Sequence, residues 1–184
     1  MWRNSTSAYG LLARALHWTI ALLILGLIPL GWYITTLDYY DPAYRTLPNL
    51  HRGLGVLVLL LAVTRIGWAI ANRAPPLAVS LKPWERLGAL LGHRLLYLAT
   101  LAIPLTGYLT TTSKGNPANL FGWFSLPALV SGGEFYQETV AALHELAAWG
   151  TLALVIVHAA AALKHQFLDH DGTLARMTGR LPRD

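Results

Sequence analysis

Four histidines stand where imidazole nitrogens could bind metal ions inside a membrane. His144 and His158 are 14 residues apart on one apolar stretch. On an α-helix this spacing places them within about 40° of the same face and about 21 Å apart along the axis. His17 and His51 stand at the starts of two other apolar stretches. Because ionisable side chains are costly inside membranes, their presence there indicates function.

Four apolar stretches would position these histidines. The chain has 184 residues, of which 54% are hydrophobic and only 12% charged, whereas about a quarter of residues in soluble domains are charged. A helical span needs about 20 mostly apolar residues. Residues 15–36, 50–71, 89–111 and 140–163 meet this need. We therefore expect an all-α integral membrane protein, in which residues 1–184 form one domain built on an antiparallel bundle of four transmembrane helices.

Basic residues alternate between the two sides of these spans, which is the positive-inside pattern. Nine flank the spans on one side, namely Arg3, Arg14, Arg73, Lys82, Arg86, Lys164, Arg176, Arg180 and Arg183, against Arg45 and Lys114 on the other. The pattern predicts a multi-pass membrane protein with both termini, including the tail 169–184, in the cytoplasm. It also accounts for the net charge of +5 without nucleic acid. The first span is longer than the core of a signal peptide, so we expect it to be retained.

Because successive spans alternate in direction, the four histidines fall at two depths. His17 and His158 lie on the cytoplasmic side, and His51 and His144 lie on the outer side. A lone histidine near a helix end often just bonds a backbone carbonyl. Four histidines at two matching depths argue against that explanation, and they predict two pairs of ligands.

Two imidazoles at each site favour haem over zinc. Zinc takes three or four protein ligands in one cluster, whereas a six-coordinate haem takes two axial ligands, a closed arrangement suited to electron transfer. The chain has no cysteine, and its methionines are Met1 and Met177, which excludes thiolate ligands, covalent c-type haem and methionine ligation within the spans. The sequence thus predicts two noncovalent b-type haems.

Arginines and glycines near the histidines fit the same arrangement. Arg65 follows His51 by 14 residues, so it shares the face of His51 at the inner depth, where a guanidinium would match a haem propionate. Arg52 and Arg45 occupy the outer end; for all three arginines the alternative is snorkelling to the interface. Five glycines would admit flat porphyrins or neighbouring helices equally well: Gly26, Gly31, Gly55, Gly107 and Gly150.

Three further histidines lie on the cytoplasmic side. His93 begins the third span at the depth of His17 and His158, so it could replace either one as a ligand or line a site beside the inner haem. His165 is seven residues beyond His158 on nearly the same face. It could hydrogen-bond a propionate or a quinone, or simply face solvent. His170 falls in a charged turn and is expected to be incidental.

Two connections carry structural expectations. Residues 112–139 should form a turn followed by a segment on the outer membrane surface, with Phe121, Trp123 and Phe124 at the interface. After the last span, the helix should continue past His165 and end near Asp171 and Gly172.

Several short motifs carry a family resemblance. The most specific is the stretch from His158 to Phe167, continued by Asp171 to Met177. Others are His17-Trp18, His51 with Gly55 and Arg65, Gly92-His93, and Lys114-Gly115-Asn116-Pro117. On these motifs, and over nearly its whole length, the chain resembles the bacterial diheme cytochrome b561 family.

The resemblance implies that the four paired histidines are haem ligands, in agreement with their depths. It also implies ubiquinone as the electron partner and superoxide as the small redox substrate. In that case Arg45, Arg52 and Lys114 are candidates for attracting the anion. His93 and His165 are candidates for relaying the protons that quinone reduction needs.

Two other functions are compatible with the same sequence. A cytochrome anchor subunit would relay electrons between a partner dehydrogenase or hydrogenase and the quinone pool, with no turnover of its own. A haem-free structural membrane protein would require all the depth matches to be accidental. Haem binding would exclude the structural membrane protein. Turnover of superoxide by the isolated protein would then distinguish a superoxide-oxidising enzyme from an anchor subunit.

Overall fold

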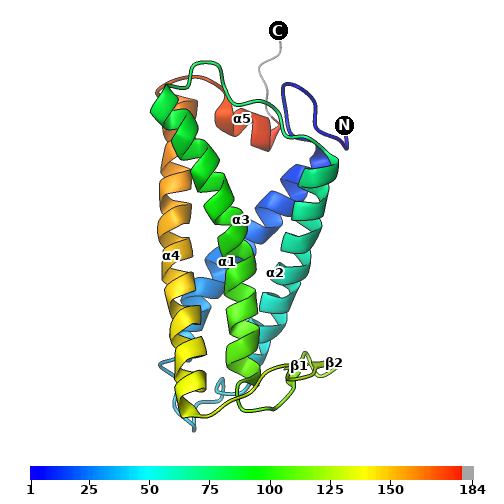
Figure 1. The fold of residues 1–184 in the computed structure, drawn as a ribbon, viewed down its shortest axis with the longest axis vertical. Helices are drawn as coiled ribbons and strands as arrows, with labels where there is room; N and C mark the ends of the chain where they lie inside the picture. The colour runs from blue at the N-terminus through cyan, green and yellow to red at the C-terminus, as the bar shows by residue number, and fades with distance from the viewer. Residues whose placement is uncertain (180–184) are drawn as a thin grey trace.

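A computed structural model describes residues 1–179, and its architecture is an up-and-down bundle of four long helices (Figure 1). The helices are α1 (Leu11–Ile34), α2 (Thr46–Ala71), α3 (Pro83–Thr112) and α4 (Glu134–Phe167). Each is long and apolar enough to cross a membrane, which confirms the predicted fold class. A hairpin of β1 (Ala118–Leu120) and β2 (Phe124–Leu126) joins α3 to α4, and the short helix α5 (Thr173–Thr178) follows α4. The basic residues Arg180 and Arg183 lie outside the described residues.

All four helices begin before the predicted spans and α3 and α4 also end after them, whereas α1 ends at Ile34, before the predicted residue 36. At 1.5 Å per residue, the 34 residues of α4 reach about 50 Å, against a hydrocarbon core of about 30 Å. The start of α3 is set by Pro83 at the first helical position, where a missing N–H costs nothing, and by Glu85, whose carboxylate accepts a hydrogen bond from the Lys82 N–H at 3.0 Å. The end of α4 at Phe167 comes before the predicted end near Gly172, which instead takes a left-handed conformation (φ 73°) at the start of α5.

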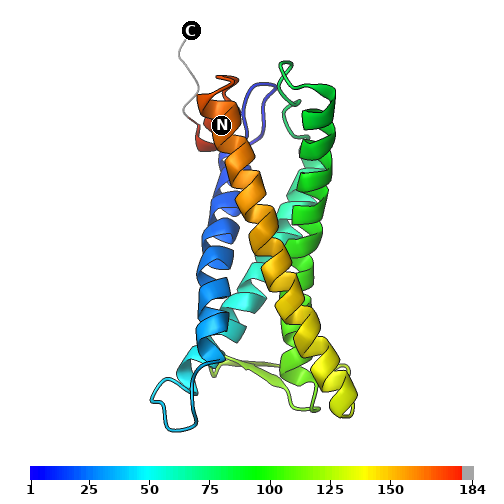
Figure 2. The same cartoon turned by 90° about the vertical axis from the view of Figure 1, so that its left-hand side faces the viewer.

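The two ends of the bundle are built differently. Both views place the N-terminal segment and α5 at one end, and the strand hairpin at the other (Figures 1 and 2); we call these the α5 end and the hairpin end. At the α5 end, the Asn4 amide donates to the carbonyl oxygens of Asn72 and Arg73 at 3.2 and 3.1 Å. Arg176 donates to Pro76 O at 2.8 Å. These bonds tie the N-terminus and α5 to the loop between α2 and α3.

The hairpin differs from the turn and surface segment expected for residues 112–139. Strands β1 and β2 pair antiparallel with Ala118 opposite Leu126. Phe121 and Gly122 both have positive φ (53° and 77°), a combination typical of the tight turns that match strand twist. Strands of three residues are too short to show a periodic pattern, which is why the sequence did not reveal them.

The packed core of the bundle is concentrated between α1 and α2. Its buried members are Ile20, Ile24, Leu27 and Val58. Helix α2 also packs along α3, and α3 along α4, whereas α1 and α4 meet at few positions. Histidine rings of α4 also lie edge to face with histidine rings of α1 and α2, with ring centroids 6.2 Å apart.

Candidate functional site

Histidine rings from different helices form two pairs in the bundle. His17 of α1 faces His158 of α4, and His51 of α2 faces His144 of α4; in each pair the ring centroids are 6.2 Å apart. Two imidazoles that bind one metal ion from opposite sides, with metal–nitrogen bonds of about 2 Å, have centroids about 6.4 Å apart. Both pairs have this separation. The fold thus brings together the residues that the sequence paired by depth.

The protonation of His144 is set by helix α3. Its Nδ1 lies 3.0 Å from the carbonyl oxygen of Ile103 and 3.2 Å from Thr106 Oγ1. Because a carbonyl oxygen only accepts hydrogen bonds, Nδ1 must carry the proton, which leaves the lone pair on Nε2. Metal-binding histidines are typically oriented in this way by a partner at the other nitrogen. No sequence signal pointed to Ile103 or Thr106, since their role depends on how α3 and α4 align.

Two glycines allow the rings of His51 and His144 to lie close to neighbouring helices. A Cβ atom at Gly31 would be 2.9 Å from Cε1 of His51, and a Cβ atom at Gly107 would be 2.9 Å from Cε1 of His144. The other three glycines considered from the sequence, Gly26, Gly55 and Gly150, would meet nothing within 4 Å. Of the five glycines, only Gly31 and Gly107 therefore contact candidate ligand rings, and both contact the pair of His51 and His144.

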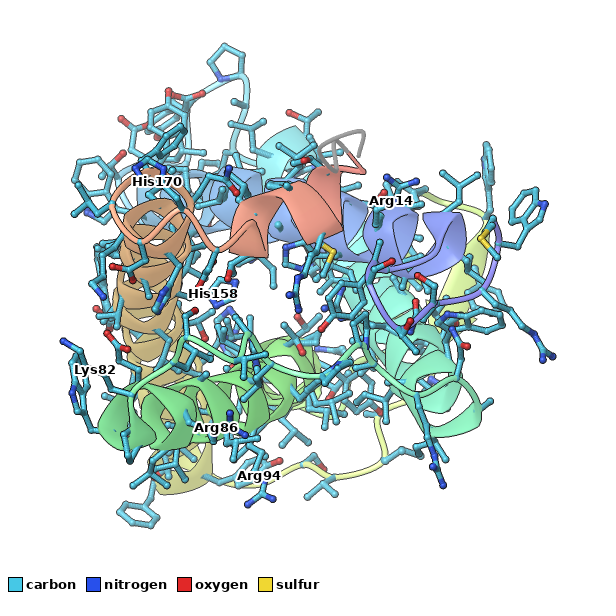
Figure 3. All side chains as sticks on the ribbon, turned by 90° about the horizontal axis from the view of Figure 1, so that it is seen from above. Arg14, Lys82, Arg86, Arg94, His158 and His170 are labelled. Carbon is cyan, nitrogen blue, oxygen red and sulfur yellow. The ribbon has the colours of Figure 1, made fainter. Side chains whose placement is uncertain are left out.

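A third ring lies beside the pair at the α5 end. The ring centroids of His93 and His158 are 5.6 Å apart, which is shorter than the separation expected for ligands on opposite sides of a metal ion. His93 is exposed, whereas His17 and His158 are partly buried. Viewed from the α5 end, His158 points toward the middle of the bundle and Arg94 points away from it (Figure 3). This geometry favours His17 over His93 as the partner of His158.

The basic residues that the sequence suggested as partners of a propionate or of superoxide lie at two depths of the bundle. The guanidinium of Arg65 lies over the ring of Tyr97, 5.5 Å from its centroid, a cation–π contact between α2 and α3. At the hairpin end, Arg52 donates from Nε to Pro48 O at 3.1 Å. Arg45 and Lys114 are exposed at the same end. The basic side chains considered for anion attraction thus share the hairpin end.

His165 belongs to a charged cluster at the α5 end. Its Nδ1 lies 2.7 Å from Asp169 Oδ2 and 3.2 Å from Asp171 Oδ2. Lys164 Nζ pairs with Glu85 and with Asp169, each at 2.7 Å, and its hydrogen bond lowers the pKa of the Asp169 carboxyl. Glu85, His165 and Asp169 are close enough together to hold a metal ion, but the Lys164 ammonium already binds one oxygen of each carboxylate. The cluster ties α3 to the end of α4.

A bundle of membrane-spanning helices with two imidazole pairs defines an integral membrane protein with two candidate metal-binding sites. Residues 8–180 match the family described as prokaryotic cytochrome b561. The chain is 38% identical to cytochrome b561 homolog 2 of Escherichia coli K12 over 98% of this chain and 96% of that protein. It is 31% identical to cytochrome b562 of Cereibacter sphaeroides over 92% and 94% of the two chains. It is 28% identical to the probable superoxide oxidase CybB of Yersinia pestis, again over 92% and 94%.

The chain belongs to the prokaryotic cytochrome b561 family. It is therefore a multi-pass protein of the bacterial inner membrane that transfers electrons, and the family implies b-type haem as its cofactor. The histidines fit that group on three grounds. Their pairs have the separation of axial ligands, Nε2 of His144 keeps its lone pair, and the buried Nδ1 of His51 has no hydrogen-bond partner within residues 1–179.

Proposed function

We propose that this protein transfers electrons from superoxide to ubiquinone, with two b-type haems as cofactors. His17 and His158 would hold the inner haem iron, and His51 and His144 would hold the outer one. The observation that carries this proposal is the equal 6.2 Å separation of the two pairs. Because His144 and His158 share α4, the two sites lie about 21 Å apart along one helix, so together they extend through much of the bilayer.

The distribution of basic residues predicts the orientation of the bundle in the membrane. We place the α5 end and both termini in the cytoplasm, because that end carries seven of the basic residues counted within residues 1–179, against Arg45 and Lys114 at the hairpin end. The positive-inside rule predicts this direction. The outer haem site then faces the periplasm, and the inner one faces the cytoplasm.

The residues of the chain have distinct tasks in this function. Bound haem supplies one-electron oxidation and reduction. The Ile103 carbonyl fixes the proton of His144 on Nδ1, and Gly31 and Gly107 leave room for the ligand rings. Arg65 is placed to neutralise a propionate at the inner level.

Three basic side chains are the candidates for attracting superoxide locally at the outer end, where the acidic Asp38, Asp41, Glu134 and Glu138 leave no net positive charge. Arg45 and Lys114 are exposed there and Arg52 is partly so, and positive charge at a site raises the local concentration of an anion. Oxidation of superoxide releases oxygen and needs no proton. Two superoxide ions and two protons convert one quinone to the quinol, with two molecules of oxygen released. His93 and His165 at the α5 end are the candidates for relaying those protons.

Support for superoxide as the donor comes from the name of one relative, the probable superoxide oxidase of Yersinia pestis, at 28% identity. The relative at 38% identity is named only as a cytochrome b561 homolog. That name is equally compatible with a relay subunit that serves a partner dehydrogenase or hydrogenase.

A turnover assay tests the proposal. Purified protein in detergent is given a soluble ubiquinone and a continuous enzymatic source of superoxide, and quinol is measured. We expect quinol to form well above the spontaneous rate. Superoxide dismutase should abolish the increase, and His144→Ala should lack it. A rate equal to the background for protein that carries both haems would refute superoxide oxidation and favour the relay function.

A further inference from the structure

A cavity lies between the N-terminal segment and the start of α1, at the α5 end of the bundle. Its volume is about 230 Å³, and the residues that line it include Arg3, Ser5, Ser7 and Arg14. A cavity of this volume has room for several water molecules or for one small polar group. Arg14 belongs to the first turn of α1 (Figure 3) and precedes the candidate ligand His17 by three residues.

Hydrogen bonds within the chain hold the N-terminal segment in place over α1. The backbone N–H of Gly10 donates to Asn4 Oδ1 at 2.8 Å, and the amide nitrogen of Asn4 is bonded to the loop between α2 and α3. The Ala8 N–H donates to Ser5 Oγ at 3.0 Å, which closes a turn. The walls of the cavity are therefore fixed before a ligand binds, so that binding costs little ordering of the chain.

The cavity carries positive charge that no acidic side chain offsets. Arg3 and Arg14 line it, and no aspartate or glutamate does so within residues 1–179. The Arg14 guanidinium packs against Gly179, which is part of the same lining. The ion pairs formed within the described residues all use Lys164 or His165 as the cation. Both guanidiniums are therefore available to an external anion.

Phosphate is the anion that suits this set of groups. A guanidinium presents parallel N–H groups that match two phosphate oxygens. The Ser7 hydroxyl, which lies 3.2 Å from Ser5 Oγ, can turn its hydrogen toward an anion in the cavity. The first turn of α1 contains no acidic residue and has no side-chain cap, so the positive end of the helix dipole adds to the attraction.

We propose that this cavity binds the phosphate headgroup of an anionic phospholipid from the cytoplasmic leaflet. Leu11 is 45% exposed beside the cavity, on a helix that crosses the membrane, so acyl chains attached to the phosphate can run down α1 into the bilayer. A zwitterionic headgroup suits the cavity less well, because its ammonium would meet two guanidiniums and no carboxylate. The bound lipid would fix the N-terminal segment to the helix that carries His17.

Native mass spectrometry of the haem-loaded full chain tests this site. Phosphatidylglycerol and phosphatidylethanolamine with identical acyl chains are each titrated into the detergent-solubilised protein. We expect one phosphatidylglycerol to bind at least tenfold more tightly than phosphatidylethanolamine. Arg14→Gln should lower the affinity for phosphatidylglycerol about fivefold, the contribution of one basic residue near a lipid surface. Arg86→Gln is the matched control, because it removes one exposed arginine of α3 outside the cavity, and it should bind as the wild type does.

Three results would overturn the inference. The first is equal binding of the two lipids, and the second is an equal loss of affinity in Arg14→Gln and Arg86→Gln, since either would reduce the effect to the general charge of this surface. The third is displacement of phosphatidylglycerol by inorganic phosphate alone, which would make the cavity a site for a soluble phosphate compound.

A second variant keeps the test decisive if Arg14→Gln loses haem. Arg3→Gln changes the N-terminal segment and leaves α1 intact, so it should keep both haems and still lower the affinity for phosphatidylglycerol; unchanged affinity would refute the site. The inference goes beyond the proposed function. Because the measurement contains neither superoxide nor quinone, its result is independent of the turnover assay.

Discussion

The glycine beside His144 allows a quantitative test of the outer haem site. In Gly107→Ala, the new Cβ would stand 2.9 Å from Cε1 of His144, and relief to an ordinary contact near 3.4 Å requires the ring to move by about 0.5 Å. A movement of this size away from α3 lengthens the distance from His144 Nδ1 to Ile103 O from 3.0 Å to at most about 3.5 Å, where a hydrogen bond is largely lost.

The loss of this hydrogen bond should weaken haem binding at the outer site. A net contribution of about 1 kcal/mol per hydrogen bond corresponds to about a fivefold lower affinity. Gly31→Ala should act on the same haem, because a Cβ there would stand equally close to His51. The inner haem should be unaffected by either change.

Haem transfer to apomyoglobin, followed by absorption, measures this effect. We expect one of the two haems to leave Gly107→Ala faster than it leaves the wild type, and the other to leave at the wild-type rate. Gly88→Ala is the control on the same helix, because a Cβ at Gly88 meets nothing within 4 Å. If both haems are lost equally, or if Gly107→Ala and Gly88→Ala behave alike, the contact between Gly107 and the ligand ring has no role in haem binding.

Three other predictions concern the ligand pairing and the two ends of the bundle. His51→Ala and His144→Ala should each remove the same haem, and His17→Ala and His158→Ala should each remove the other, as measured by haem content and redox titration. If His93→Ala loses a haem and His17→Ala loses none, the ligand opposite His158 is His93 and the pairing is wrong. Because the hydrogen bond from Lys164 lowers the pKa of Asp169, its stabilising effect is complete at neutral pH and is lost as the pH falls below about 4. Thermal unfolding of Lys164→Met should therefore occur at a lower temperature at pH 7, with the difference from the wild type shrinking on acidification; a constant difference would contradict the ion pair. In Gly53→Ala the new Cβ would clash with the Phe121 ring and displace the hairpin from α2, whereas the new Cβ of Gly55→Ala meets nothing within 4 Å. Chymotrypsin should therefore cut the hairpin faster in Gly53→Ala than in the wild type, and Gly55→Ala should be cut at the wild-type rate.

The sequence alone determined the fold class, because four apolar stretches long enough to span a bilayer allow few arrangements once successive spans alternate in direction. Depth within the membrane follows from position along a span. The matching of His17 with His158 and of His51 with His144 therefore needed no coordinates.

Only the tertiary structure decided how the helices align and rotate against each other. The choice of Gly31 and Gly107 from five similar glycines, the carbonyl that fixes the proton of His144, and the hairpin turn at Phe121 all depend on contacts between segments far apart in the chain. The cavity beside Arg14 likewise requires the N-terminal segment to fold over the start of α1. Helical periodicity describes each helix by itself, and side-chain packing between helices sets their rotation and register. For this reason the sequence predicted which histidines pair, and the folded bundle determined what surrounds them.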